Sequence, residues 1–600
     1  MSKYTLAQPA EGGSYSYNEH NGFYTANGSS YYLVYLVEGN IDNITLSTQQ
    51  ATLGESTVTL EKTSDGVVFE NSNSSTSTEF FITNGELTRS SLIQETETTH
   101  VTDSTAFQVK GNGVLVLSNE SANADLITVE EEGKVKVTET ATLTNANALA
   151  NSVIGNGTIE LSFDTSYNSV PNVGADFTGT THIKEGCFTI NGASFGNKLI
   201  LDDGVNFRLS DGSTVTLAAD KQLVLNGTSE VHQNTNQSTG KGADFTVNGV
   251  VSGTGTYDRR GGGTLTFSNS VTLGAFKQEN TTGSTTFQGN SVTLGNLEVE
   301  TQTLTIAAKT ATIGGIDTTF SLGGNNHATG LYIKNSVVNI GNGTDSTTVT
   351  TTRVEMGDSE TGNGGTLNVK ANAQLIVTGS DDAGDYHATG FLLGEWEENS
   401  TLTINGKVLS QNASIMCGDV KGTVTVENGG FLATKGFLHN KDNSGSLELT
   451  LKDGGEIVLG STGITAKTIT TTFGAGTVGI SSDSSISKAV TLNSATGTTF
   501  DTTLWTWADN GSSITKGSNG GTLTIGGTIS GSGELIKDGI GSCRERCGHV
   551  FQREYLAERH PVVLCEATGF VALATQYQLA HVSKESYLIF RQLHNPQQRI

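Results

Sequence analysis

The fold is decided by Gly365-Thr-Leu-Asn-Val369, Ser400-Thr-Leu-Thr-Ile404, Gly422-Thr-Val-Thr-Val426 and Ser446-Leu-Glu-Leu449. In each stretch Leu, Val or Ile recurs at every second residue, a period that buries one face of a β-strand and leaves Thr, Asn or Glu on the other. Thr suits the outer face because its β-branched side chain favours extended backbone. The stretches start 35, 22 and 24 residues apart. Periods of about 20 to 50 residues are typical of solenoids, in which similar units stack along one axis.

The type of solenoid follows from the sequence around these strands. A leucine-rich repeat needs an Asn ladder and a helical side, and a propeller needs four strands in each blade of about 40 residues; neither pattern is found. Short strands with frequent turns and only 4 Pro in 600 residues favour a β-helix. The alternative is a string of β-sandwich modules, which would carry more Pro and a buried aromatic in each module of about 100 residues. We therefore predict an all-β chain folded as a right-handed parallel β-helix (a β-solenoid), a monomeric rod with roughly 20–25 residues per coil.

The composition limits the classes of function. Charged residues make up 16% of the chain, below the roughly 25% of an ordinary globular domain. The formal net charge of −26 repels phosphate backbones, so we expect no nucleic-acid partner. No apolar stretch is long enough to span a membrane as a helix, and the N-terminus lacks the apolar core of an export signal. The five cysteines, at 187, 417, 543, 547 and 565, have the spacing of neither a disulfide framework nor a zinc site.

Two segments align with each other at a constant offset of 278 residues. One spans 249–268 and begins Gly-Val-Val-Ser-Gly-Thr-Gly-Thr-Tyr-Asp-Arg-Arg-Gly-Gly-Gly; the other, 527–541, reads Gly-Thr-Ile-Ser-Gly-Ser-Gly-Glu-Leu-Ile-Lys-Asp-Gly-Ile-Gly. Gly253, Gly255, Gly261 and Gly263 fall on Gly531, Gly533, Gly539 and Gly541, and Arg259 falls on Lys537. The pattern resembles the passenger-associated repeat of bacterial autotransporters. Glycine permits positive φ at tight corners between strands, and we expect a structural role for Arg259 and Arg260 as well.

The repeat and the texture of the sequence divide the chain into three parts. Residues 1–50 include a cluster of aromatic residues between positions 15 and 35, and we expect an N-terminal cap or the first coils there. Residues 51–541 are expected to form the parallel β-helix. After residue 541 the repeat stops, and residues 542–600 hold 6 of the 11 arginines but only 2 of the 75 glycines. We interpret this tail, helical or disordered, as the result of a frameshift or insertion that truncates the sequence before an autotransporter's outer-membrane barrel. The alternative is a genuine small helical domain.

Parallel β-helices also include polysaccharide lyases and hydrolases, so the acidic residues were weighed as catalysts. Hydrolysis of a glycosidic bond needs two carboxylates about 5 to 9.5 Å apart. Adjacent acids occur at Asp202-Asp203 and Asp381-Asp382, close to glycines in turn contexts. Because Asp commonly accepts hydrogen bonds from backbone in turns, we expect turn residues there. The motif His-Ala-Thr-Gly occurs twice, at His327-Ala-Thr-Gly330 and His387-Ala-Thr-Gly390. We interpret it as an internal duplication, with a metal-binding or catalytic pair of histidines as the alternative.

Trp505 and Trp507 are two residues apart and should project from one face of a short strand. We expect them to pack in the core or in a cap, with a carbohydrate platform as the alternative. The segment 357–365 has residues that suit Ca²⁺ but not the spacing of a calcium loop, and we expect a solvated loop. Because no other catalytic or phosphate-binding motif is found, we assign no catalytic, cofactor-binding or metal-binding residue and expect no cofactor.

The resemblance implies a non-catalytic passenger domain, exposed on the cell surface at the outer membrane or secreted, with the adhesive or structural role of an adhesin. Its partners would be glycans or the surfaces of host or sister cells. Two alternatives stay open. One is a carbohydrate-active β-helix enzyme, which a cluster of Asp, Glu, Arg or Lys on three successive coils would favour. The other is a secreted matrix scaffold without a barrel.

Overall fold

The computed structural model divides the chain into two compact units, Met1–Thr264 and Leu265–Ile600. All described elements are β-strands, and there is no helix among the described residues. The described residues are 16–17, 24–26, 29–31, 58–62, 71–74, 77–92, 105–117, 126–137, 153–162, 168–169, 176–190, 195–233, 239–314, 320–322, 325–327, 330–357, 364–381, 390–394, 399–439, 445–546, 563–566, 577–582 and 587–592.

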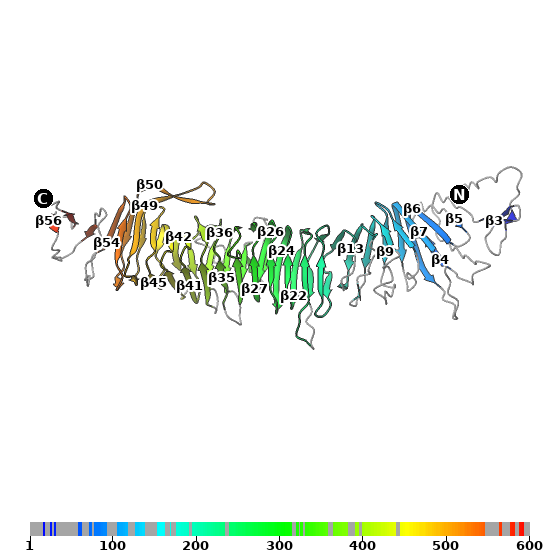
Figure 1. Ribbon diagram of the computed structural model, residues 1–600, viewed down its shortest axis with the longest axis horizontal. Coiled ribbons are helices and arrows are strands. Elements are labelled where there is room, and N and C mark those ends of the chain that lie inside the picture. The colour runs from blue at the N-terminus through cyan, green and yellow to red at the C-terminus, as the bar shows by residue number, and fades with distance from the viewer. Residues whose placement is uncertain are drawn as a thin grey trace. The chain divides into compact units, whose positions relative to one another are not determined.

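The coils of the C-terminal unit stack side by side (Figure 1). Their strands form three parallel ladders, named faces A, B and C, which the chain visits in that order in each coil. Face A contains β28 (Thr310–Ile313), β33 (Thr347–Thr351), β36 (Ala373–Val377), β39 (Lys407–Ser410), β46 (Thr477–Ile480) and β53 (Leu535–Asp538). Face B contains β31 (Leu331–Ile333), β34 (Val354–Met356), β37 (Phe391–Leu393), β40 (Ile415–Cys417), β47 (Ser484–Ile486) and β51 (Thr522–Ile525). Longer strands continue from face A onto face B or extend beyond face A: β24 (Val271–Thr281), β26 (Ser291–Val299), β42 (Phe431–His439), β44 (Glu456–Ile464) and β49 (Thr498–Trp507).

Face C contains the four stretches that decide the fold. They form β35 (Thr366–Val369), β38 (Ser400–Ile404), β41 (Lys421–Val426) and β43 (Ser446–Leu451), which are consecutive neighbours in one parallel ladder. The same face also includes β23 (Leu265–Phe267), β25 (Thr285–Phe287), β27 (Gln302–Ile306), β32 (Ser336–Ile340), β45 (Ile469–Phe473), β48 (Val490–Leu492) and β52 (Ile529–Gly531). The predicted all-β parallel β-helix is confirmed.

The core is built by the period of two in these strands. Leu402 and Val424 are 0% exposed and are register partners, so they stack inside the coils. Thr401 and Thr403, the residues on either side of Leu402, remain partly exposed on the outside. Because every coil repeats this arrangement, the apolar interior is continuous along face C, and each backbone hydrogen-bonding group pairs with the coil above or below.

The N-terminal unit has the same kind of stacking. One ladder contains β9 (Lys134–Val137), β11 (Thr158–Ser162), β13 (Thr180–Glu185), β15 (Lys198–Leu201), β18 (Gln222–Leu225) and β21 (Val250–Gly253). A second contains β14 (Cys187–Ile190), β16 (Asn206–Leu209), β19 (Ser229–Gln233) and β22 (Thr256–Gly261). A third pairs β17 (Thr214–Leu217) with β20 (Asp244–Val247). All pairings in these three ladders are parallel.

The strand pairing changes toward the two ends of the chain. Near the N-terminus β4 (Val58–Lys62) and β5 (Asn71–Ser74) pair antiparallel with β6 (Ser77–Leu92), and β6 then pairs parallel with β7 (Thr105–Leu117). Near the C-terminus parallel pairing extends past residue 541, because β54 (Ser542–Arg546) is in register with β51. The other described parts of the tail are the strands β55 (Val563–Glu566), β56 (Tyr577–Val582) and β57 (Tyr587–Gln592).

Two sequence expectations fall wholly or largely outside the described residues. Of the aromatic cluster in residues 15–35, only the backbone of β1 (Ser16–Tyr17), β2 (Tyr24–Ala26) and β3 (Ser29–Tyr31) is described, as a small antiparallel sheet. Most of residues 547–600 lie outside the described residues as well. A search of the described part of the chain finds no helix with the length and apolar character needed to cross a bilayer.

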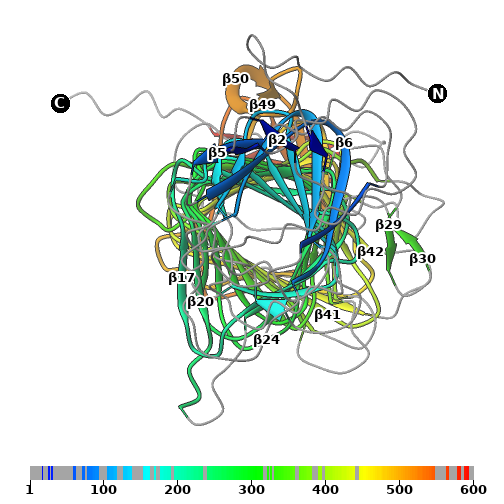
Figure 2. The ribbon, with the colours of Figure 1, turned by 90° about the vertical axis from the view of Figure 1, so that its right-hand side faces the viewer.

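A β-hairpin leaves the stack near the C-terminal end of the second unit. It is formed by the end of β49 and by β50 (Ile514–Gly520), which pair antiparallel with Trp505 opposite Lys516 and Trp507 opposite Ile514. Figure 2, which looks along the coils, shows the hairpin outside their outline, on the side away from β41. In Figure 1 it extends from β49 back toward β36. The hairpin therefore lies on the outer surface of the coils of this unit.

Candidate functional site

Asp202 and Asp203 lie in a turn of the N-terminal unit, as predicted, and both join adjacent coils. The Asp202 carboxylate accepts hydrogen bonds from His182 Nε2 (2.9 Å), Lys184 Nζ (2.9 Å) and Asn226 Nδ2 (2.8 Å). Burial tends to raise the pKa of Asp202, but these three donors outweigh it and lower the pKa to about 2. Asp203 Oδ1 accepts a hydrogen bond from the backbone N–H of Thr228 (2.8 Å). The two carboxylates therefore link adjacent coils through hydrogen bonds.

Asp381 has a similar role in the C-terminal unit. Its Oδ1 accepts a hydrogen bond from the Ser414 backbone N–H (2.6 Å), and its Oδ2 accepts one from the Ser414 hydroxyl (2.9 Å). Lys435 Nζ lies 3.0 Å from the same Oδ2. These polar contacts of the carboxylate hold the turn against the coils that follow. Its sequence neighbour Asp382 lies outside the described residues.

The basic residue of the passenger-like repeat is buried in both copies. Arg259 is 0% exposed and donates hydrogen bonds from Nε to Gln233 Oε1 (2.6 Å) and from a terminal nitrogen to the carbonyl of Gly263 (2.7 Å). Lys537 is 5% exposed and donates to the carbonyls of Asp538 (3.0 Å) and Gly539 (2.6 Å). Burial lowers the pKa of Arg259 to about 10 and also lowers that of Lys537. Each cation therefore satisfies carbonyl groups of the glycine turn that follows it.

The glycines of the repeat also take equivalent conformations. Gly253 and Gly531 have φ values of 132° and 103°, and Gly261 and Gly539 have φ values of 90° and 79°. A Cβ at Gly253 would lie 2.0 Å from the carbonyl oxygen of Leu225 in the coil below. Positive φ and close approach between coils exclude other residues at such corners. The predicted structural role of the repeat is thus confirmed.

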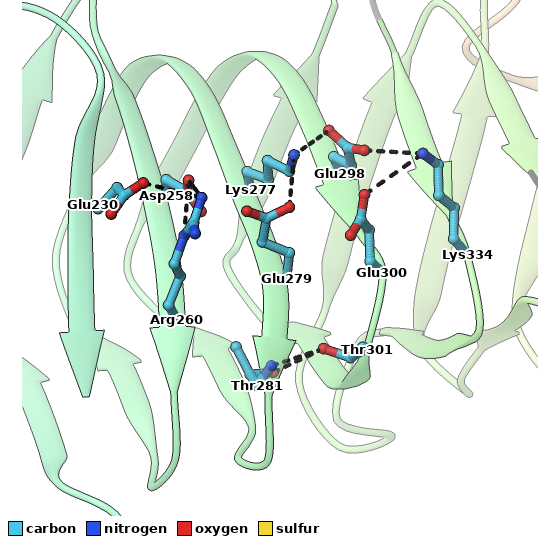
Figure 3. A network of polar contacts seen from close by, with 10 residues as sticks. All are labelled: Glu230, Asp258, Arg260, Lys277, Glu279, Thr281, Glu298, Glu300, Thr301 and Lys334. Atoms are coloured by element: carbon cyan, nitrogen blue, oxygen red, sulfur yellow. Dashed lines mark hydrogen bonds and ion pairs between the residues drawn. The ribbon is translucent and has the colours of Figure 1, made fainter. Parts of the chain in front are cut away.

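Charged side chains outside the coils form networks of ion pairs in each of the two units (Figure 3). In the N-terminal unit Arg260 pairs with Glu230 (3.1 Å) and Asp258 (2.9 Å). This contact confirms a structural role for Arg260. Because Glu230 and Asp258 are register partners on neighbouring coils, the guanidinium lies between two stacked carboxylates and reduces their mutual repulsion.

The network of the C-terminal unit contains Lys277, Glu279, Glu298, Glu300 and Lys334 (Figure 3). Lys277 Nζ lies 2.8 Å from Glu279 and 4.0 Å from Glu298, and Lys334 Nζ lies 3.1 Å from Glu298 and 3.6 Å from Glu300. Burial raises the pKa of the 1% exposed Glu298 carboxyl, although Lys334 and Lys277 oppose the shift. Lys277 and Lys334 pair with all three carboxylates, so the cluster carries at most one surplus negative charge, fewer than a cation site of several carboxylates would supply.

The remaining polar candidates lie at least partly outside the described residues. Of the His327 and His387 pair, only the backbone of His327, in β30 (Asn325–His327), is described. Residues 358–363 of the segment 357–365, which was considered for Ca²⁺ binding, likewise lie outside the described residues. Among the described side chains, no group of three or more His, Cys, Asp or Glu is placed to hold a metal ion.

The two tryptophans project from one face of the hairpin strand β49, as predicted, but they pack on the outside of the coils rather than in the interior. Face A carries an outer stripe formed by Ile376, Leu409, Ala433 and Val458, one residue from each of four consecutive coils in register. Trp505, Trp507, Ile514 and Phe431 pack against this stripe. The Trp505 and Phe431 ring centroids are 5.5 Å apart. The prediction of core or cap packing was wrong because the apolar partner surface is external.

The next position of the stripe explains how the indole fits. Gly479 is the register partner of Val458, and a Cβ there would lie 2.9 Å from Trp505 Nε1. The hairpin tip reaches farther back, since Gln374 Nε2 donates a hydrogen bond to the Ser512 carbonyl (2.9 Å), 138 residues away in sequence. The hairpin therefore spans five coils, from the one containing Gln374 to the one containing Gly479.

A pocket of about 440 Å³ lies beside the hairpin. Trp507 forms one wall, and the coils contribute side chains that include Gln411, Asn412, Lys435, Ser461 and Ser482. Gly460 also lines the pocket, and a Cβ there would lie 3.0 Å from Lys435 Cα. Within the described part of the chain, the side chains of Gln411, Asn412 and Ser461 make no hydrogen bond, so their polar atoms are available to a ligand.

Comparison with known proteins adds no relative. No family model, curated protein sequence or solved structure matches this chain. The geometry alone therefore indicates what the site can do. Its amides, hydroxyls and ammonium group can donate and accept hydrogen bonds, and the half-buried indole offers an apolar surface.

The outer stripe was missed at the sequence level, although a signal was present. In Leu375-Ile376-Val377, Val408-Leu409 and Ile457-Val458-Leu459 the alternation of apolar and polar residues fails. Consecutive apolar residues in a strand indicate burial on both faces. These three coils should therefore have been expected to carry a covering element on their outer surface.

Proposed function

We propose that this chain is the non-catalytic passenger of an autotransporter, presented on the outer surface of the cell or released from it, with an adhesive or structural role. The observation that carries the proposal is the pair of passenger-like repeats. Both copies bury a basic residue against the carbonyls of a glycine turn, and both place glycines at positive φ. This local geometry gives the motif a physical role as a corner of the coil, which supports the resemblance.

The non-catalytic part of the proposal is supported by the acidic residues. Asp202, Asp203 and Asp381 accept hydrogen bonds from donors on neighbouring coils, and Glu298 forms an ion pair with Lys334. A general acid or base in a glycosidase would need a carboxyl free to exchange a proton with substrate. These carboxylates instead hold the stack together.

Surface presentation can be tested by placing the chain between a secretion signal and an autotransporter barrel and treating intact cells with protease. We expect the chain to be cut or released from outside the cell as a folded, slowly digested product. A matched variant, Gly253→Val, introduces a Cβ that would lie 2.0 Å from the Leu225 carbonyl oxygen and should become rapidly digested. Retention of the wild-type chain inside the cell would contradict the proposal.

The absence of catalysis needs a separate assay. The purified chain is incubated with a panel of neutral and acidic polysaccharides, and new reducing ends and unsaturated products are measured. We expect neither to increase over a heat-denatured sample. A rise in either product that is lost in Asp202→Asn or Asp381→Asn would refute the non-catalytic assignment and favour the enzyme alternative.

A further inference from the structure

The pocket beside the hairpin offers a more specific role than a general adhesive surface. One wall is the indole of Trp507, which is half-buried against the outer stripe and keeps part of its ring exposed. Its orientation is fixed by the hairpin, because Trp507 pairs with Ile514, and the Asp501–Lys516 ion pair joins β49 to β50. A held aromatic ring loses little conformational freedom when a ligand packs on it.

The opposite wall is polar and comes from successive coils. Gln411 and Asn412 lie in the turn after β39, Lys435 lies in β42, and Ser461 and Ser482 follow on the next two coils. An amide presents both a donor and an acceptor, and a hydroxyl can act as either. Such a surface complements a ligand with hydroxyl groups at several positions around a ring.

The electrostatics favour a neutral ligand. Among the described residues that line the pocket, Lys435 is the only cation, and its ammonium group lies 3.0 Å from Asp381 Oδ2. With its charge already compensated, Lys435 retains donors for hydrogen bonding but little net attraction for an anion. A phosphate or carboxylate ligand would need an uncompensated cation or several backbone N–H groups.

The size and the mixture of surfaces agree with one class of ligand. Pockets of about 300–1,000 Å³ hold small organic ligands, and this one measures about 440 Å³. A pyranose has an apolar face of C–H groups that packs on an aromatic ring, and its hydroxyl groups lie around the edge.

We propose that this pocket binds a neutral pyranose unit of a glycan, with its apolar face on Trp507 and its hydroxyl groups on Gln411, Asn412 and Lys435. The inference rests on the proposed function, because it names the ligand class that an adhesive passenger would recognise through this site. It assigns a binding role to the hairpin, which holds Trp507 in place.

The test uses the purified full chain and a panel of immobilised neutral oligosaccharides, with acidic oligosaccharides as a second panel. Hits are titrated in solution by calorimetry and by tryptophan fluorescence. We expect binding to at least one neutral oligosaccharide, a loss of tenfold or more in Trp507→Ala, and a loss of several-fold in Asn412→Ala. Thr506→Ala, an exposed position on the same strand, is the matched control and should bind like the wild type.

Two variants keep the test falsifiable if Trp507→Ala loosens the hairpin. Asn412→Ala and Ser461→Ala alter the coil side of the pocket and leave the tryptophans intact. Wild-type affinity in both, no binding to the neutral panel, or binding only to acidic oligosaccharides would each overturn the assignment. Surface presentation is measured separately, so a chain that is displayed but binds no neutral glycan refutes the pocket and leaves the proposed function standing.

Discussion

Replacement of Trp505 by Ala should detach the hairpin β49–β50 from the coils without unfolding them. Truncation of a fully buried Trp costs about 3–5 kcal/mol. Trp505 is half-buried against Phe431 and the outer stripe, so we expect a loss of about 2 kcal/mol in the free energy that holds the hairpin closed. Since 1.4 kcal/mol corresponds to about a tenfold change in an equilibrium constant, hairpin opening should become about 30-fold more frequent.

Native-state hydrogen exchange measures this opening directly. Amides of β50 should exchange about 30-fold faster in Trp505→Ala, whereas amides of β38 and β41 on face C should keep their wild-type rates. Trp505→Phe is the informative companion, because the indole N–H of Trp505 has no hydrogen-bond partner among the described residues. The Phe variant keeps the ring contacts and removes an unsatisfied donor, so its exchange should stay within about threefold of wild type.

Three outcomes would refute this reasoning. Wild-type exchange of β50 in Trp505→Ala would show that the stripe does not hold the hairpin. Equal acceleration in Trp505→Phe and Trp505→Ala would show that the ring contacts retained by Phe do not hold the hairpin closed. Faster exchange on face C as well would mean that the hairpin supports the coils themselves. Thr506→Ala, at the exposed neighbouring position, controls for an unspecific effect of truncation on the strand.

Further predictions concern the inter-coil contacts and the cysteines. Asp202→Asn should lower the free energy of unfolding in urea by about 1 kcal/mol at pH 7. This difference should disappear as the pH falls from about 4 to 2, because the Asp202 carboxylate, whose pKa is lowered, stabilises the fold only while it is ionised. Arg259→Met should cost about 2–4 kcal/mol, measured by the same unfolding assay, because it leaves Gln233 and a buried carbonyl without their donor; Arg259→Lys should lose less. In native protein at pH 8, a thiol reagent should modify half-buried Cys187 well before Cys417, because burial raises the pKa of the Cys417 thiol to about 11. Equal rates of modification would contradict the burial of Cys417.

The fold could be predicted from sequence because its determinants are local. The alternation in Ser400–Ile404 or Lys421–Val426 identifies an inward and an outward face without knowledge of any partner. The recurrence of such strands every 20 to 35 residues then implies stacking, and the glycines of the repeat mark the corners. Nothing beyond these patterns was needed to expect parallel register along face C.

The surface features could not be predicted in the same way, because they depend on distances along the stack. Lys277 meets Glu298 only because their strands are in register across 21 residues, an offset that varies from coil to coil. Gln374 meets Ser512 across 138 residues. The spacing of Trp507 from Trp505 places both on one face of a strand, but it does not show that the strand leaves the stack. The pocket beside Trp507 includes residues such as Gln411, which lie more than 90 residues earlier in the sequence.

Consecutive coils stack in parallel with Thr403 opposite Thr425, and engineered disulfides can test this register. In a chain whose native cysteines are replaced, Thr403→Cys is combined with Thr425→Cys, its register partner on the next coil, or with Thr423→Cys, one step out of register on the same face. Register partners in neighbouring strands lie about 4.8 Å apart, within the range that a disulfide bridges, whereas the shifted pair lies about 8 Å apart. We expect rapid oxidation of the 403/425 pair and little oxidation of the 403/423 pair. Preferential oxidation of the 403/423 pair would contradict the register, and with it the faces, the hairpin contacts and the pocket that depend on it.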